Sequence, residues 1–175
     1  MSRRLLVGID VGTTSVKTML FDAQGGLLAQ ASQEYPTAHP HPSWAQQDPH
    51  DWWQAVCQTL RKVTVDPREI AGVAISSQAP TMLAVDLRGD PLYPALIWMD
   101  RRSEAQCAWL REKVAEERIT ATNGGRVDPY YLAPKLLWFR ENEPELYRQT
   151  RVFLQAIGYI VFRLCGTFSM DASHG

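Results

Sequence analysis

The ten residues Gly8-Ile9-Asp10-Val11-Gly12-Thr13-Thr14-Ser15-Val16-Lys17 decide how this chain is interpreted. They lie between two short apolar runs, Leu5-Leu6-Val7 and Met19-Leu20-Phe21. Two such runs joined by a tight Gly-Thr-Thr turn are typical of a β-hairpin. We therefore expect the chain to begin with two paired strands whose shared end carries the polar residues of the stretch.

The predicted bend combines groups that suit a bound phosphate. Gly12 lets backbone N–H groups approach an anion closely. Thr13 and Thr14 add hydroxyl donors, and Lys17 adds a positive charge. Asp10 would repel a bare phosphate but suits the Mg²⁺ that a nucleotide brings with it. These residues therefore predict a site for the phosphates of a nucleotide, with Asp10 on the metal.

The bend matches neither of two common nucleotide-binding motifs. The sequence contains neither G-x-x-x-x-G-K-[ST] nor G-x-G-x-x-G, so it has no Walker loop and no dinucleotide fingerprint. If the bend binds no ligand, the alternative is an ordinary polar hairpin turn beside a solvated lysine.

Composition narrows the class of protein. The chain has 175 residues, 45% of them hydrophobic and 21% charged, and a net charge of −1. Such a composition is typical of a globular domain, and without a basic block it gives no support to nucleic-acid or membrane binding. Its three cysteines are widely spaced and suggest neither a metal site nor a disulfide framework. We expect a soluble, cytoplasmic protein.

The rest of the pattern predicts alternating strands and helices, which indicates an α/β fold. Strands are expected at 5–10, 15–22, 27–34, 70–75, 81–87, 96–99, 152–154 and 167–170. Helices are expected at 49–63, 101–117, 134–140, 143–149 and 158–165, with irregular segments at 35–47 and 118–133.

Five stretches together resemble the N-terminal part of the FGGY family of carbohydrate kinases. They are Gly8–Lys17, Trp44–Trp53, Ala95–Arg102, Asp128–Tyr130 and Ala133–Trp138. They occur in the same order and at the same spacing as in the family, and their sequences most resemble those of xylulose kinases, with glycerol kinases second. The resemblance implies an actin/Hsp70/hexokinase-like (ribonuclease H-like) fold, with a mixed sheet flanked by helices.

The resemblance places part of the sugar contact at Gln78, Ala79 and Pro80. Relatives carry hydrogen-bonding side chains after the glutamine, whereas neither alanine nor proline has one. This difference leaves the identity of the sugar open. The alternative is a plain turn at the end of a strand.

Three further residues are implied on the sugar side. Trp98 would help to wall the polyol pocket, and Tyr130 resembles a substrate-facing position, since aromatic faces pack well against sugar C–H groups. Asp100 would contribute a polar group. The alternatives are an ordinary core position for Trp98 and a helix N-cap for Asp100.

Members of this family are longer, two-domain enzymes. By resemblance, residues 1–175 form the N-terminal, sugar-binding domain, while the base that takes the proton of the sugar hydroxyl and most of the adenosine site lie in a second domain beyond residue 175. We therefore assign no catalytic residue here and expect the isolated chain to be inactive. Its expected partners are a sugar or polyol, ATP, the C-terminal domain and, through exposed surface, a second copy in a homodimer.

The preferred function is thus that of an ATP-dependent kinase for a ketopentose such as D-xylulose or a related polyol. The alternative from another class is a non-catalytic module that binds sugar or nucleotide. A third possibility is an actin-like or Hsp70-like ATPase lobe, which would share Gly8–Lys17 but would not bring Trp98 and Tyr130 to the same cleft as Asp10.

Overall fold

A computed structural model describes residues 4–63 and 66–170. The strands are β1 (Leu5–Val11), β2 (Ser15–Phe21), β3 (Leu27–Glu34), β4 (Gln46–Gln47), β5 (Ile70–Ser77), β6 (Leu83–Val85), β7 (Ala95–Leu96) and β8 (Val152–Leu154). The helices are α1 (Pro49–Val63), α2 (Glu104–Val114), α3 (Glu116–Asn123), α4 (Leu132–Asn142), α5 (Pro144–Gln149) and α6 (Ala156–Cys165), and one 3-10 turn spans Pro67–Glu69.

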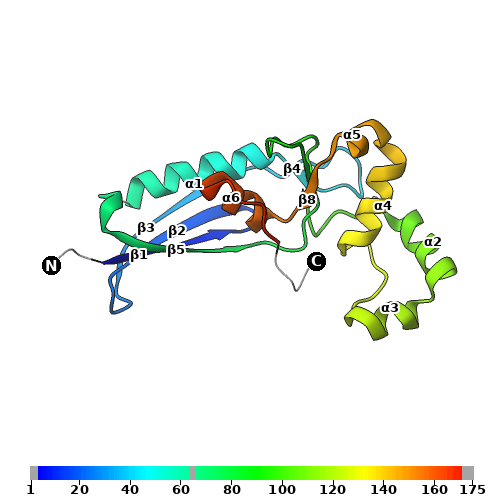
Figure 1. Cartoon of the computed structure of the whole chain (residues 1–175), viewed down its shortest axis with the longest axis horizontal. Helices are drawn as coiled ribbons and strands as arrows, with labels where there is room; N and C mark the ends of the chain where they lie inside the picture. Colours follow the sequence, from blue (N-terminus) through cyan, green and yellow to red (C-terminus); the bar gives the residue numbers. More distant parts are fainter. Residues whose placement is uncertain (1–3, 64–65, 171–175) are drawn as a thin grey trace.

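The main sheet has the strand order β3-β2-β1-β5. Strands β1, β2 and β3 form an antiparallel meander, and β5 runs parallel to β1 after the chain has crossed over through α1 (Figure 1). In the described chain, β4 pairs with β7 and β6 pairs with β8 in two smaller sheets. The predicted mixed sheet with flanking helices is therefore present.

One face of the sheet packs against α1. Alternate residues of β1, including Val7 and Ile9, are buried against this helix, whose Trp52 and Val56 are fully buried. The Oγ1 atoms of Thr18 and Thr59 meet at 2.7 Å between sheet and helix. The two-residue period of the strand thus separates a buried face from one that remains open.

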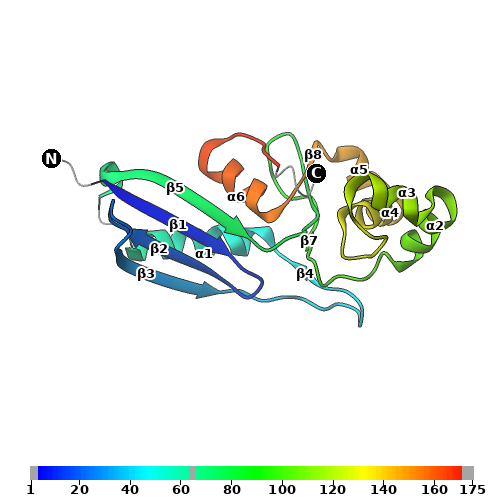
Figure 2. The same ribbon diagram turned by 90° about the horizontal axis from the view of Figure 1, so that it is seen from below.

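The open face carries the residues that alternate with the core. Leu6, Gly8 and Asp10 on β1 lie opposite Phe21, Met19 and Lys17 on β2. Figure 2 shows this face toward the viewer, with α1 behind it. Asp10 and Lys17 are exposed at the end of the strands that leads into the Gly-Thr-Thr bend.

A second group of elements surrounds a smaller core. Helices α2, α3, α4 and α5 gather at the end of the molecule away from β1–β3 (Figure 1). Phe139 and Trp138 of α4 pack with Met82 and Leu96. Among the described residues, no helix combines the length and apolar character needed to cross a bilayer.

Several predicted elements differ in the structure. The segment 118–133 is not wholly irregular, because α3 occupies its first part, with Gly124 as a left-handed C-cap at φ 71°, and α4 begins at Leu132. The predicted helix 101–117 is interrupted: α2 covers Glu104–Val114, Ala115 breaks it with φ 58°, and its last two residues begin α3.

Three predicted strands are also shorter or missing. Strand 96–99 is limited to β7, because the backbone turns after Leu96 and the Asp100 N–H donates to the Ile97 carbonyl at 3.0 Å. Strand 81–87 is limited to β6, and residues 167–170 form no strand.

Candidate functional site

The bend between β1 and β2 is tight and open to an anion. The Gly12 N–H donates to the Ser15 carbonyl at 3.0 Å, and a Cβ on Gly12 would lie 3.2 Å from that oxygen, so glycine suits this position. The N–H groups of Thr13 and Thr14 donate to no atom of the described residues. Adjacent free N–H groups at a turn are the usual donors of a phosphate-binding concavity.

A carboxylate lies next to these donors. Asp10 is exposed, accepts a hydrogen bond from Ser76 Oγ at 2.6 Å, and pairs in register with Lys17 across the hairpin. The described residues contain no cluster of three His, Cys, Asp or Glu side chains. The donor set therefore fits a Mg²⁺ that is held by one carboxylate and by the phosphates of a nucleotide, rather than by a cage of protein ligands.

Tyr35 supports the bend from behind, a role that the sequence analysis did not assign. Its hydroxyl donates to the Gly12 carbonyl, and its N–H donates to the Thr14 carbonyl at 3.2 Å. Burial, and then the negative charge of Asp10, raise the pKa of Tyr35 far above its usual value. The phenol therefore stays a neutral donor to the Gly12 carbonyl, while the Tyr35 backbone N–H holds the Thr14 carbonyl.

Gln47 is a second residue that was missed, and it connects more segments than Tyr35. Its side chain is buried, and its Nε2 donates to the Thr13 carbonyl at 2.7 Å and to Thr37 Oγ1 at 2.8 Å. Its Oε1 accepts from Trp52 Nε1 at 2.9 Å and from Gln78 Nε2 at 2.7 Å. In the sequence, Gln47 lies within the stretch Trp44–Trp53 that resembles the family, but no local pattern indicates its partners.

Trp98 brings the predicted sugar side to the bend. Its Nε1 donates to Thr13 Oγ1 at 3.0 Å, although the two residues are 85 positions apart. The side chain is 39% exposed, so Trp98 is not an ordinary core residue. The bend and this indole therefore share one hydrogen bond.

The residues after β5 lie beside the same network. Gln78 donates its N–H to the Val11 carbonyl at 2.8 Å and is buried, while its Oε1 has no partner in the described chain. Ala79 follows, and its carbonyl accepts from the Tyr130 hydroxyl at 3.2 Å. Pro80 is buried directly after it.

Asp100 differs from both expectations. It is fully buried, accepts from the Ala45 N–H at 2.7 Å and from Arg102 Nε at 2.9 Å, and forms an ion pair with that guanidinium, so its carboxylate supports a loop instead of facing a ligand. It is not an N-cap either, since α2 begins four residues later. The guanidinium of Arg102 lies over the indoles of Trp44 and Trp138, with its carbon 3.7 and 4.8 Å from their ring centroids.

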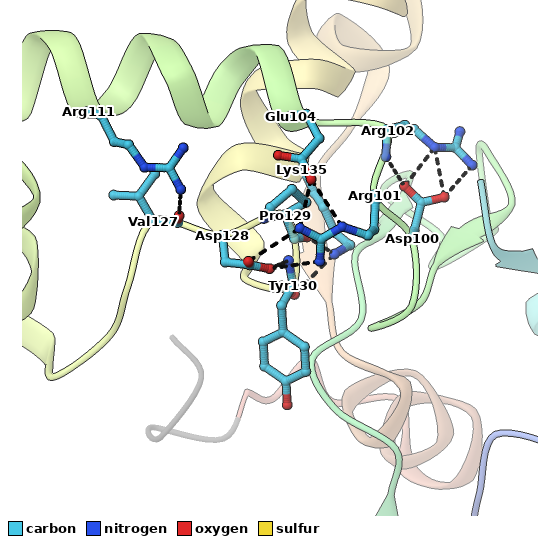
Figure 3. Close-up of polar contacts among 10 residues, drawn as sticks. All are labelled: Asp100, Arg101, Arg102, Glu104, Arg111, Val127, Asp128, Pro129, Tyr130 and Lys135. Atoms are coloured by element: carbon cyan, nitrogen blue, oxygen red, sulfur yellow. Dashed lines mark hydrogen bonds and ion pairs between the residues drawn. The ribbon is translucent and has the colours of Figure 1, made fainter. Parts of the chain in front are cut away.

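Tyr130 is held by a polar cluster shown in Figure 3, in which its ring points away from the charged groups. Lys135 Nζ donates to the carbonyls of Pro129 and Tyr130, and Asp128 Oδ1 accepts from the Tyr130 N–H at 2.8 Å. Arg101 bridges Asp128 and Glu104. Burial lowers the pKa of Lys135 to about 8, against the opposing charges of Asp100 and Asp128.

We predict that Gln47→Met disturbs the bend and Gln78 together. The variant leaves the Thr13 carbonyl and two buried N–H donors unpaired, so it should lower the free energy of unfolding by about 2–4 kcal/mol in urea titrations. Thr59→Val is the matched control, because it removes a buried hydrogen bond from the other end of α1. In amide NMR spectra, Gln47→Met should shift Thr13, Thr14 and Ala79, and Thr59→Val should not. Unmoved resonances in the Gln47 variant would contradict the prediction.

The pKa of Lys135 predicts how stability depends on pH. The native state holds this amine with a pKa of about 8 rather than 10.5, so between these values the unfolded chain binds more protons and stability rises with pH. Relative to Lys135→Met, the wild type should gain about 3 kcal/mol in the free energy of unfolding as the pH rises from below 8 to above 10.5. Parallel urea titrations of both proteins test this, and a constant difference would refute it.

Comparison with known proteins now adds to this geometry. Residues 5–175 match the model of the FGGY family of carbohydrate kinases, N-terminal domain. The xylulose kinase of Escherichia coli strain K12 is 32% identical over 171 residues, which cover 97% of this chain and 35% of that enzyme. A glycerol kinase of Roseobacter denitrificans is 35% identical over 170 residues, covering 92% and 34%. The chain thus spans about a third of the length of these relatives.

Solved structures agree with the fold. The xylulose kinase of Rhodospirillum rubrum superposes with a TM-score of 0.91 at 28% identity, covering 96% of this chain and 36% of that one. The xylulose kinase of Brucella ovis gives 0.84 at 30% identity, covering 91% and 34%. The expected actin/hexokinase-like fold and the stated order of relatives are therefore confirmed, and the chain belongs to the FGGY family of carbohydrate kinases.

Proposed function

We propose that this chain is the N-terminal part of an ATP-dependent kinase that phosphorylates a ketopentose such as D-xylulose, or a related polyol. The observation that carries the proposal is the hydrogen bond from Trp98 Nε1 to Thr13 Oγ1, 3.0 Å long. It joins an aromatic side chain suited to a sugar's C–H face to a bend suited to phosphates. An ATPase lobe would need the bend but not the indole beside it.

On the nucleotide side, Asp10 would hold Mg²⁺, while Gly12, Thr13, Thr14 and Lys17 would face the phosphates of ATP. The metal would neutralise charge on the phosphates. The residues of the chain supply position: phosphoryl transfer depends mainly on fixed donors and alignment, and the two free N–H groups of the bend are already fixed by the backbone.

On the acceptor side, Gln78, Ala79, Pro80, Trp98 and Tyr130 would line the sugar. Trp98 and Tyr130 offer ring faces, and Gln78 Oε1 offers an unpaired acceptor to a hydroxyl. Asp100 acts indirectly in this proposal, by holding the segment that carries Trp98.

The general base and most of the adenosine site would belong to a second domain, and residues 1–175 to the N-terminal domain. The base must reach the hydroxyl proton, and no carboxylate of this chain is assigned to that task. The isolated chain should therefore bind its substrates but not catalyse phosphoryl transfer. We place the parent enzyme in the cytoplasm. The chain's coverage of only about a third of each relative supports a larger parent enzyme.

A second candidate is a non-catalytic module that binds sugar or nucleotide. Ala79 and Pro80 favour it, because they carry no side-chain group that bonds a hydroxyl. Phosphoryl transfer by a protein that carries this segment together with a second kinase domain, assayed with xylulose, ribulose, glycerol and erythritol, separates the two. Transfer to one of them supports the kinase, and sugar binding without transfer supports the module.

We predict that Asp10→Asn weakens the binding of Mg·ATP to this chain about tenfold or more, because a charged metal ligand is lost. NMR titration should place the shifted amides at Gly12–Ser15. Asp22→Asn is the control, since Asp22 lies in the β2–β3 turn and accepts only local backbone N–H groups. Equal affinities in wild type and Asp10→Asn would contradict the proposed metal site.

We also propose a homodimer through the open sheet face. Leu6 is 45% exposed there, and Met19 and Phe21 lie opposite β1 on the same side. Exposed apolar surface of this kind favours association. Sedimentation velocity should show a concentration-dependent dimer that Leu6→Lys abolishes and Leu164→Lys, on α6, retains. A wild-type chain that stays monomeric at high concentration would refute the dimer.

A further inference from the structure

The polar atoms of the proposed sugar wall are largely occupied within the protein. The Tyr130 hydroxyl donates to the Ala79 carbonyl at 3.2 Å, and the Trp98 indole N–H donates to Thr13 Oγ1 at 3.0 Å. Pro80 has no N–H to offer. A ligand at this wall therefore meets mainly ring and C–H surface.

One polar atom of the proposed sugar wall, Gln78 Oε1, has no hydrogen-bond partner in the described residues. Gln78 is 9% exposed, and its Nε2 donates to Gln47 Oε1. A buried acceptor without a donor is unfavourable, and a ligand hydroxyl would satisfy it. A ligand that complements this wall therefore needs at least one hydroxyl beside Gln78 and apolar surface beyond it.

Pro80 and Tyr130 also line a hollow of about 710 Å³ on the side of the helices, which we call the helical hollow. Its remaining apolar wall comes from α2, α3, α4 and the segment between the last two. These residues include Leu110, Val114, Ile119, Val127 and Leu132. Arg126 contributes an exposed charge. The size and the apolar lining are typical of a site for a small organic ligand.

A simple ketopentose does not explain this hollow. Its carbons all carry oxygen, so each would lose hydration inside an apolar wall without gaining a partner. Because Pro80 and Tyr130 line the hollow and also belong to the proposed sugar wall, the hollow adjoins the wall at these two residues. The part of a ligand that extends from the wall into the hollow has to be apolar to gain from burial there.

We propose that the substrate is amphiphilic: a polyol whose hydroxylated end lies at Gln78 and Trp98 and whose other end carries an alkyl or aryl substituent in the helical hollow. This inference rests on the proposed function and narrows its substrate class. Specificity comes from the apolar substituent, while the polyol end supplies the hydroxyl that is phosphorylated.

The test uses the ¹⁵N-labelled chain with three probes: glycerol, its phenyl ether, and anisole, which has the ring without the diol. The phenyl ether should shift the amides of Val114, Ile119 and Val127 saturably, and bind about tenfold or more tightly than either glycerol or anisole. Equal binding of ether and glycerol would overturn the role of the hollow. Equal binding of ether and anisole would overturn the role of the polyol end, and shifts confined to other regions would overturn both.

Variants check the location. Leu110→Arg puts a long charged side chain into the hollow and should reduce the preference for the ether over glycerol to less than about twofold. Val114→Gln is the second variant if Leu110→Arg loses its native circular dichroism. Leu164→Arg, an exposed change on α6, should keep the full preference. A preference that survives both hollow variants would refute the inference.

The proposed function is measured separately in the same samples. Mg·ATP should shift amides of the bend at Gly12–Ser15 whatever the ether does. Bend shifts without an ether preference would leave the kinase proposal standing and reject the amphiphilic substrate. An ether preference without bend shifts would reject the proposed nucleotide site and leave the amphiphilic ligand site standing.

Discussion

The candidate site depends on the hydrogen bonds that the side-chain amide of Gln47 makes. Its four hydrogen bonds reach the Thr13 carbonyl, Thr37, Trp52 of α1 and Gln78 after β5. All the hydrogen-bonding capacity of the amide is used, and the residue is only 2% exposed. In such a dry environment the bonds act as a unit, because breaking one leaves a buried polar atom unpaired. The bend, the helix and the strand end are therefore fixed relative to one another.

Gln46, the other residue of β4, extends this constraint to the helical end of the molecule. Its Oε1 accepts from Arg102 Nη2 at 2.8 Å, and Arg102 is buried in an ion pair with Asp100. Neighbouring residues of a strand point to opposite faces, so two consecutive glutamines serve two different networks. A two-residue strand thereby connects the main sheet to the segment that carries Trp98. The buried charge pair is tolerated because both ions are hydrogen-bonded and the guanidinium contacts the rings of two indoles.

Much of the sheet half was predictable because its signals are local. Apolar runs and turn residues predicted β1, β2 and β3, and the helix expected at 49–63 has the bounds of α1. The helical half was harder. Gly124 reads as a breaker in the sequence but caps α3, and nothing local signals the positive φ of Ala115. The site divides in the same way: the bend is one contiguous stretch, whereas Gln47 and Asp100 owe their roles to partners that lie up to 55 residues away.

Thr13 is the residue where the two sides of the proposed reaction meet. Its carbonyl accepts from Gln47, its hydroxyl accepts from Trp98, and its N–H remains free in the described chain. The bond to Gln47 fixes the bend, the bond from Trp98 fixes the indole, and the free N–H of Thr13 is left for an anion. A phosphate at that N–H and a polyol against that indole would then be positioned by the same residue. Alignment of donor and acceptor would follow from the framework of the domain rather than from a flexible loop, which is the arrangement that phosphoryl transfer requires.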